Sequence, residues 1–380
     1  MVSKGNIMSG LVSITIAGSI SALFHGIGLF ENPPWHIVYS DIVPFFEKAI
    51  EPGFPYISKT IEYPALTGLF VHLMGIIGRH EIGYYIATSF FLIAFAAGAT
   101  FILLKIATPR PDAARNDMLR YWIFAPSMLV FMVYNWDVIA LFFVVLGLYM
   151  MERKKSYTAA AAFAFGFTSK FYPIIYMAPL VLSCFEQSQK REKATALPHA
   201  FGIVAVFIAV ALAINAIFMV VNFDAWSYFF SFNSAREANP DSIWTVIQFA
   251  IGPLEISTIN IVSLLLFAAS YGIFLWRYRA MSPLFLSFGG TILFLLFNKV
   301  FSPQYLLWLL PFFVLMPIKK RWFYSLEFAN LAALFSILAW FFLGREPVHL
   351  WATLVFVVLR HLALIAVFVH TIRKRFTFSF

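Results

Sequence analysis

Long runs of apolar residues alternate with short polar stretches along nearly the whole chain. A membrane-spanning α-helix needs roughly 20 apolar residues, and most of these runs approach that length. Several central runs are only about 13–17 residues long, which a membrane protein tolerates around a cavity, where water or substrate covers the backbone. The pattern predicts about twelve crossings, at residues 7–30, 82–106, 119–135, 137–151, 157–169, 171–185, 200–221, 257–276, 283–298, 304–318, 323–343 and 350–371.

The composition agrees with this pattern. Of the 380 residues, 61% are hydrophobic and 12% are charged, and a water-soluble domain could not bury so much apolar surface. The single cysteine, Cys184, excludes an intramolecular disulfide framework and a cysteine-based zinc site. The sequence therefore predicts an all-α polytopic membrane protein that forms one domain over residues 1–380.

The positive charge predicts the orientation of the chain. Lys and Arg number 27 against 18 Asp and Glu, for a net charge of +9. Most of the basic residues fall in short clusters between apolar runs, at Lys4, Lys105–Arg120, Arg153–Lys155, Lys190–Lys193, Arg277–Arg279, Lys319–Arg321 and Arg373–Arg375. The positive-inside rule places such clusters in the cytoplasm. Both termini are then cytoplasmic, loops 31–81, 222–256 and 298–303 lie on the far face, and a nucleic-acid partner is not expected.

The first far-face loop contains two short helix signals. Ala65–Gly78 is apolar but short, begins after Pro64, and ends at the polar residues Arg79–Glu81. We expect it to lie along the membrane interface, because a crossing here would break the alternation of the basic clusters. Glu47, Lys48 and Glu51 are expected to form the water-facing side of a short amphipathic helix. The prolines in Pro52–Pro55 end this helix.

The same far-face turns carry the candidate chemistry. The candidate residues are Asp41, Glu62, Tyr63, Asn135, Trp136, Asp137, Lys170, Arg236, Lys299, Gln304 and Tyr305. A carboxylate beside several cations suits a reaction in which the acid activates a nucleophile and the cations stabilise a leaving phosphate. The alternative is that charges at helix ends only mark the water boundary. The unusual composition of its loop makes Asp41 the strongest candidate.

Arg360 lies in the middle of the last predicted helix, where a buried arginine needs a partner. Glu327 on the preceding helix is one candidate partner, and the phosphate of a bound lipid is another. No Walker A loop, HExxH motif or G-x-S-x-G elbow occurs in the sequence. ATP-driven transport within this chain is therefore not predicted, and neither is a metal site.

Three short blocks carry a resemblance to the C-type (GT-C) glycosyltransferase superfamily. YSD…GFPY…EYPAL, at Tyr39–Leu66, is similar to the polyprenol-phosphate mannosyltransferases of family 87. FNKVFSPQYLLWLLP, at Phe297–Pro311, is similar to that family and to the first mannosyltransferase of GPI-anchor synthesis, and Asn135–Asp137 resembles a recurring turn of these enzymes. The chain departs from the GPI enzyme because Ile42 and Val43 follow Asp41 in place of a second acid, so the resemblance does not establish the acceptor.

The resemblance implies a GT-C-like bundle with interfacial helices in the first outer loop, 31–81, and a catalytic aspartate there. It implies a donor sugar, most often mannose, on a polyprenyl phosphate, and a lipid-linked or glycolipid acceptor. We expect no cofactor or metal, because the motifs that would hold one are missing from the sequence. Asp41 would be the general base of an inverting displacement. Lys299 is the first candidate for the cation that binds the leaving phosphate, and Lys170 and Arg236 are the next candidates. Sugar or acceptor contacts would come from Glu62, Tyr63, Asn135, Trp136, Asp137, Gln304 and Tyr305, and Trp308 could pack on sugar or lipid.

Two other classes of function compete with this interpretation. A secondary transporter or lipid-sugar flippase also places charged groups in a polytopic bundle, and a membrane scaffold would leave the loop chemistry unused. A transporter places its site near the bilayer midplane, whereas the candidate residues here cluster at one face. The identity of the sugar and the far-face compartment stay open.

Overall fold

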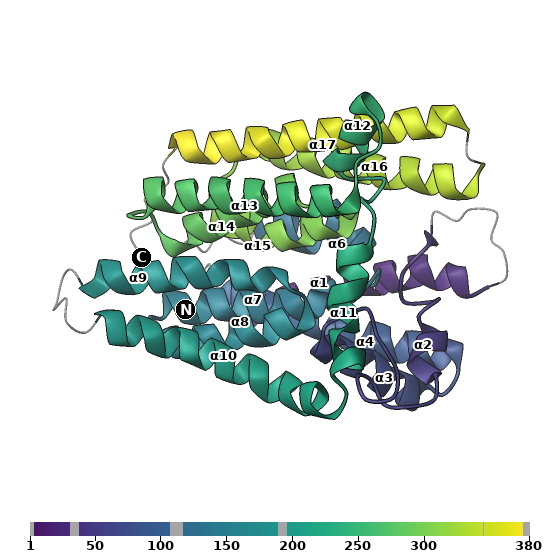
Figure 1. The fold of residues 1–380 in the computed structure, drawn as a ribbon, viewed down its shortest axis with the longest axis horizontal. Helices are drawn as coiled ribbons and strands as arrows, with labels where there is room; N and C mark the ends of the chain where they lie inside the picture. The colour runs from purple at the N-terminus through teal and green to yellow at the C-terminus, as the bar shows by residue number, and fades with distance from the viewer. Residues whose placement is uncertain (1–3, 31–37, 107–116, 189–195, 345, 375–380) are drawn as a thin grey trace.

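The computed structural model describes residues 4–30, 38–106, 117–188, 196–344 and 346–374, and these residues form helices and loops without a β-strand (Figure 1). The elements are α1 (Lys4–Gly26), η1 (Ile27–Leu29), α2 (Phe46–Ile50), α3 (Ala65–Gly78), α4 (Glu81–Ile106), η3 (Leu119–Ile123), α6 (Pro126–Phe131), α7 (Asp137–Glu152), α8 (Ser156–Ser169), η4 (Tyr172–Tyr176), α9 (Met177–Ser188), α10 (Ala196–Val221), α11 (Phe223–Ala235), α12 (Ile243–Ile251), α13 (Ile256–Tyr278), α14 (Pro283–Phe297), η6 (Pro303–Leu309), α15 (Leu310–Leu315), α16 (Lys320–Phe342) and α17 (Pro347–Lys374).

Six helices in the described residues are long and apolar enough to cross a membrane. They are α1 with η1, α4, α10, α13, α16 and α17. A chain with several such helices is an integral membrane protein. The predicted all-α polytopic class is confirmed to this extent, and the count of about twelve crossings stays a prediction.

The long helices lie side by side, and α11 runs across them (Figure 1). α16 packs along α17, α7 along α8, and α1 along α4. In the first loop, α2 and α3 pack on each other and on α4. The two helices expected in this loop are thus present, and their position at the membrane interface stays a prediction.

Three of the predicted crossings do not begin as α-helices. Residues 119–135 divide into a π-helical turn, η3, and the short helix α6, which starts at Pro126. Residues 171–185 and 304–318 each begin as a 3-10 helix containing a proline, Pro173 or Pro303, before the α-helices α9 and α15 follow. Proline lacks the backbone N–H that a regular α-helix needs, and it restricts the conformation of the residue before it. The regular α-helix is therefore interrupted near these prolines.

The segment 222–256, expected as a far-face loop, contains two helices, α11 and α12. The side chain of Asn222 caps α11 by accepting a hydrogen bond from the backbone N–H of Ala225 at 3.0 Å. An Asn at this position satisfies one of the free N–H groups of a helix start. Residues 236–242, which join α11 to α12, are called the α11–α12 linker below.

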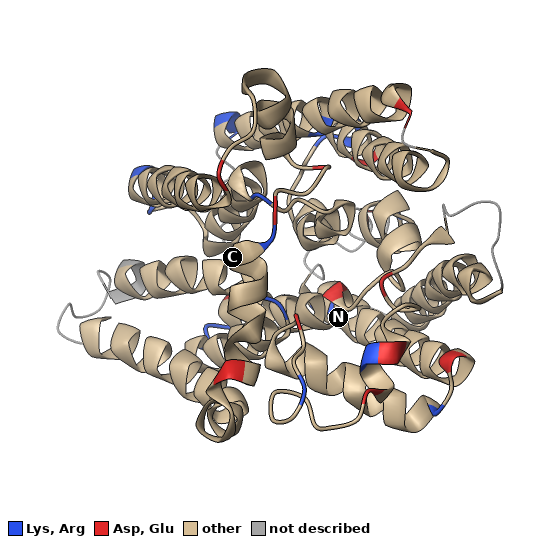
Figure 2. Cartoon of the chain, turned by 45° about the vertical axis from the view of Figure 1, so that its right-hand side comes forward, with Lys and Arg blue, Asp and Glu red and all other residues tan. Residues whose placement is uncertain are grey.

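The basic clusters and the candidate residues lie at opposite ends of the same helices. α8 begins directly after Arg153–Lys155 and ends directly before Lys170, and α13 ends beside Arg277–Arg279. α14 then returns from Pro283 to Phe297, two residues before Lys299. Figure 2 shows charged residues mostly at helix ends and in loops, with the helix interiors largely uncharged. Chain connectivity therefore supports a common face for the candidates, although which face is cytoplasmic stays a prediction.

Candidate active site

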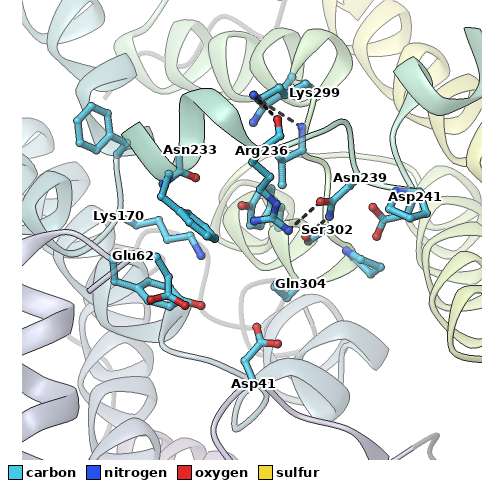
Figure 3. Close-up of a pocket in the computed structure, with 18 of the residues that line it drawn as sticks. Asp41, Glu62, Lys170, Asn233, Arg236, Asn239, Asp241, Lys299, Ser302 and Gln304 are labelled. Carbon is cyan, nitrogen blue, oxygen red and sulfur yellow. Dashed lines mark hydrogen bonds between the residues drawn. The ribbon is translucent and has the colours of Figure 1, made fainter. Parts of the chain in front are cut away.

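A cavity of about 1000 Å³ is lined by segments that are far apart in the sequence. They include the first loop, the end of α8, α11, the α11–α12 linker, residues 298–302 (called the α14–η6 linker below), η6 and α16. The predicted site residues that line the cavity are Asp41, Glu62, Tyr63, Lys170, Arg236, Lys299, Gln304 and Tyr305, and Trp308 lines it too (Figure 3). Figure 3 shows Asp41, Lys170 and Arg236 directed toward the same space.

Asp41 is positioned by backbone contacts between the first loop and the turn that precedes α7. Its backbone N–H donates to the carbonyl of Tyr134 at 2.9 Å. Nearby, the ring of His25 lies between the carbonyls of Val38 and Val130, at 2.9 Å and 2.6 Å. The start of the loop is thus attached both to the end of α1 and to α6, which limits the movement of the Asp41 carboxylate.

The surroundings of Asp41 adjust its acidity. Burial raises the pKa of the Asp41 carboxyl above its ordinary value, while the charge of Lys170 and a hydrogen bond from the Tyr39 hydroxyl oppose the rise. The net pKa is raised. A general base works best when its pKa approaches the working pH, so the shift suits Asp41 to accept a proton.

Lys170 is held by a buried carboxylate beneath the cavity. Its ammonium lies 3.0 Å from Oδ1 of Asp137, which is fully buried. The same oxygen accepts a hydrogen bond from the indole N–H of Trp308 at 3.1 Å. Burial lowers the pKa of Lys170, but the charges of Asp137 and Asp41 and the hydrogen bond to Asp137 outweigh burial and raise it. Lys170 therefore presents a permanent positive charge at the cavity wall.

The Asn135–Asp137 turn lies behind the cavity wall and does not line it. The Asn135 side-chain oxygen accepts a hydrogen bond from the backbone N–H of Asp137 at 2.9 Å. Trp136 is buried and packs edge-on against Tyr63, with ring centroids 5.0 Å apart. The structure thus brings this turn to the site through its contacts with Lys170 and Tyr63.

An aromatic stack forms one wall of the cavity. The rings of Tyr172 and Trp308 are 3.9 Å apart and nearly parallel, and Tyr305 stacks on the other side of Trp308 at 4.1 Å. The ammonium of Lys170 lies 5.0 Å from the Tyr305 ring. Both faces of the Trp308 ring are thus covered, which leaves Tyr305 and the edges of the stack for contact with a sugar ring or an isoprenoid chain.

The two other candidate cations differ in their surroundings. Arg236 is exposed to the cavity, and its guanidinium donates to the side-chain oxygen of Asn239 at 2.8 Å. Lys299 is only 8% exposed. Its ammonium donates to the carbonyls of Ser234 and Arg236 at 3.2 Å and 2.6 Å. Burial, together with the charge of Arg236, lowers the pKa of Lys299.

The family described as mannosyltransferase (PIG-M) matches residues 132–369, which is more than half of the chain. The chain belongs to this mannosyltransferase family. Together with the long apolar helices, this makes the protein a membrane mannosyltransferase of the GT-C superfamily, as the sequence blocks indicate. A comparison with curated proteins finds no match.

The region that matches the family model contains only part of the candidate site of this mannosyltransferase. Lys170, Arg236 and Lys299 fall inside the matched region, whereas Asp41 and the other first-loop residues precede it. The first loop therefore comes to the site through tertiary contacts with matched residues, such as the bond from Asp41 to Tyr134. The family implies a lipid-linked sugar donor and a glycolipid acceptor in general.

Among the cavity residues to which the sequence gave no site role are three polar ones that lie beside Asp41 or Arg236. Tyr39 faces the Asp41 carboxylate, and Asn239 and Asp241 come from the α11–α12 linker. Tyr39 stands in the YSD block, so its closeness to Asp41 in sequence was the available signal. Asp241 stood out only as a charge in the segment expected as a far-face loop, and Asn239 carried no signal, because only the folded linker brings both to the cavity.

A second, smaller cavity of about 420 Å³ adjoins the first. Its walls come from α8, α10, α11 and the first loop, and they are almost entirely apolar. The two cavities share Tyr63, Pro64, Phe171, Phe229 and Phe230 as wall residues. Few residues of α10 are buried, so this apolar space adjoins a surface that faces lipid in a membrane.

Proposed function

We propose that the protein transfers mannose from a polyprenyl-phosphate donor to a hydroxyl group of a lipid-linked or glycolipid acceptor, with inversion at the anomeric carbon. The observation that carries the proposal is the gathering of the Asp41 carboxylate with the cations Lys170 and Arg236 around a single cavity. This set of groups can activate a hydroxyl and stabilise a phosphate that leaves.

In the proposed step, Asp41 accepts the proton of the acceptor hydroxyl while its oxygen attacks the anomeric carbon. The bond from that carbon to the phosphate oxygen breaks, and polyprenyl phosphate leaves with the bonding electrons. One carboxylate is sufficient, because phosphate is a good leaving group and needs no acid. The raised pKa of Asp41 supports this role, since it makes the carboxylate a better proton acceptor.

Arg236 and Lys170 are the groups proposed to meet the phosphate. Both line the cavity, where a new anionic charge is costly unless fixed cations face it. The guanidinium of Arg236 is exposed and presents a planar set of donors that matches phosphate oxygens. Lys299, which the sequence alone favours, directs its ammonium to two carbonyls, and we assign it an indirect role below.

Sugar and acceptor contacts are proposed for the remaining cavity residues. In the described part of the chain, the side-chain oxygen of Gln304 is buried and has no hydrogen-bond partner. Glu62 and Tyr63 lie on the same cavity. These groups can bind sugar hydroxyls, whereas Asn135, Trp136 and Asp137 would act by supporting Tyr63 and Lys170. That the reaction needs no metal stays a prediction.

The polyprenyl chain of the donor is proposed to occupy the second cavity. That space is apolar and joins the first cavity at Phe229 and Phe230 on α11, one to two turns before Arg236. A phosphate at Arg236 would therefore place the first isoprene units beside these two rings. The rest of the chain could then follow α10 into the lipid.

The test is a transfer assay with the detergent-purified protein, polyprenyl-phosphate mannose and a panel of acceptor lipids, with products identified by mass spectrometry. We expect a mannosylated lipid with inverted anomeric configuration. Asp41→Asn should reduce transfer by roughly 10²-fold or more, the usual cost of losing a general base. Glu47→Gln is the matched control, because Glu47 is an exposed carboxylate in the same loop.

Three outcomes decide the proposal. Near-normal turnover by a monodisperse Asp41→Asn protein would remove Asp41 from the mechanism. Retention of the anomeric configuration would overturn the single displacement. Movement of a labelled lipid across vesicles without a new product would favour the flippase alternative.

A further inference from the structure

The α11–α12 linker and the α14–η6 linker are bonded to each other beside the cavity. The backbone N–H of Asn239 donates to the carbonyl of Lys299 at 3.0 Å. The side-chain amide of Asn239 donates to the hydroxyl of Ser302 at 2.9 Å. Asn239 thus contacts both ends of the second linker, and the two segments form one wall of the site.

Lys299 attaches this wall to the end of α11. Its ammonium donates to the carbonyls of Ser234 and Arg236, on either side of the last helical residue, Ala235. A cation is favoured there, because the last carbonyls of a helix have no partner within the helix and carry partial negative charge. In the described part of the chain, no carboxylate forms an ion pair with Lys299.

Arg360 on α17 attaches the same wall from the opposite side. Its guanidinium donates to the carbonyl of Asp241 in one linker and to the carbonyl of Phe301, at 2.9 Å, in the other. It also donates to Asn330 on α16 at 3.1 Å. This set of contacts corrects the expectation that Glu327 is its partner, since Glu327 accepts hydrogen bonds from Ser127 instead.

Arg236 belongs to the linker that Lys299 and Arg360 bind, at Arg236 and at Asp241. Its guanidinium is directed by Asn239, whose own amide is fixed by Ser302. Figure 3 shows the same chain of contacts from Ser302 through Asn239 to Arg236. The position of the guanidinium in the cavity therefore depends on where the α11–α12 linker is held.

We infer that Lys299 and Arg360 are positioning residues, which clamp the α11–α12 linker between them so that Arg236 meets the leaving phosphate. The inference rests on the proposed function for the role of Arg236, but the clamp itself rests only on the contacts above. It also assigns a purpose to the FNKVFSPQY block: Lys299, Phe301 and Ser302 each bind the linker or its clamp.

A double-mutant cycle separates positioning from direct phosphate binding. Lys299→Met should lower kcat on the order of 10²-fold, the cost of displacing a positioned group by about 1 Å. In an Arg236→Met background it should cost little more, because Arg236 is the group through which it acts. Lys299→Arg should retain most of the activity, because it keeps the charge and the donors. Lys155→Met, at an exposed lysine, is the matched control.

Hydrogen exchange tests the clamp without an activity assay. We expect Lys299→Met and Arg360→Lys to speed amide exchange over residues 234–242, where the N–H of Asn239 is bonded to the carbonyl of Lys299. Exchange in α4 should stay unchanged, which would exclude general unfolding. Arg360→Lys keeps the charge but replaces the planar guanidinium, which donates to both linkers and to Asn330, with a single ammonium nitrogen.

The two experiments have outcomes that would overturn the inference. Full additivity of Lys299→Met with Arg236→Met would overturn the positioning role and favour direct phosphate binding by Lys299. Unchanged exchange over residues 234–242 in both clamp variants would overturn the clamp. If no donor supports transfer by the wild-type protein, the proposed function fails, and the exchange measurement still decides whether the clamp exists.

Discussion

Asp137 and Lys170 form a buried ion pair with 3.0 Å between Oδ1 and the ammonium, directly behind the wall of the cavity. Asp137 also accepts a hydrogen bond from the indole N–H of Trp308. A lysine this close to the reaction space would otherwise be free to move or to lose its proton. The pair keeps Lys170 charged and directed toward the cavity, so the Asn135–Asp137 turn acts on the chemistry through Lys170.

The first prediction concerns this pair. Asp137→Asn should destabilise the protein by about 3–5 kcal/mol, because removing one partner of a buried pair leaves the other charge uncompensated. Adding Lys170→Met should recover part of the lost stability, since no unpaired charge remains. Thermal unfolding in detergent of the two single variants and the double variant measures the coupling. Strict additivity of the two losses would show that the pair does not contribute as a unit.

The second prediction concerns the pH dependence of transfer. Asp41 must be deprotonated to act as a base, so kcat/KM should fall as the pH falls through its raised pKa. Tyr39→Phe removes a hydrogen bond that stabilises the charged carboxylate. It should therefore raise that pKa further and move the acid limb of the profile to higher pH. An acid limb that stays in place, or moves to lower pH, would contradict the assignment.

The third prediction concerns the apolar cavity. Ala211 lines it, and Ala213, two residues along α10, is exposed and does not. Ala211→Trp should fill part of the space and raise the KM for a long-chain donor more than for a short-chain analogue. Ala213→Trp adds the same side chain to the outer surface of the helix and should leave both KM values unchanged. Equal effects of the two variants would move the polyprenyl chain elsewhere.

The fourth prediction concerns orientation in the membrane. Ser58 in the first loop and Lys155 before α8 are both exposed, at opposite sides in the predicted topology. In a Cys184→Ser background, a cysteine at position 58 should react with an impermeant thiol reagent from outside intact cells. A cysteine at position 155 should react only after permeabilisation. Labelling of both positions from the same side would refute the topology.

Local pattern was sufficient for the membrane class and for most helices. A lipid environment demands long apolar segments whose backbone groups bond within the segment, and that demand is visible in the sequence without knowledge of neighbours. α4 and α13 accordingly lie within a residue or two of their predicted ranges. Alternation of the helices then predicted that Asp41, Lys170 and Lys299 share one end of the bundle, and the cavity contains all three.

Partner choice required the tertiary structure. Lys299 and Arg360 both stood out as charges beside or within apolar runs, but the sequence could not tell that their partners are backbone carbonyls of distant segments. Every residue offers a carbonyl, so composition contains no signal for such a bond. The sequence by itself determined which groups are placed at the cavity end of the bundle. Only packing decided which of them present their charge to the cavity, as Arg236 does, and which turn it to the backbone carbonyls of the wall, as Lys299 does.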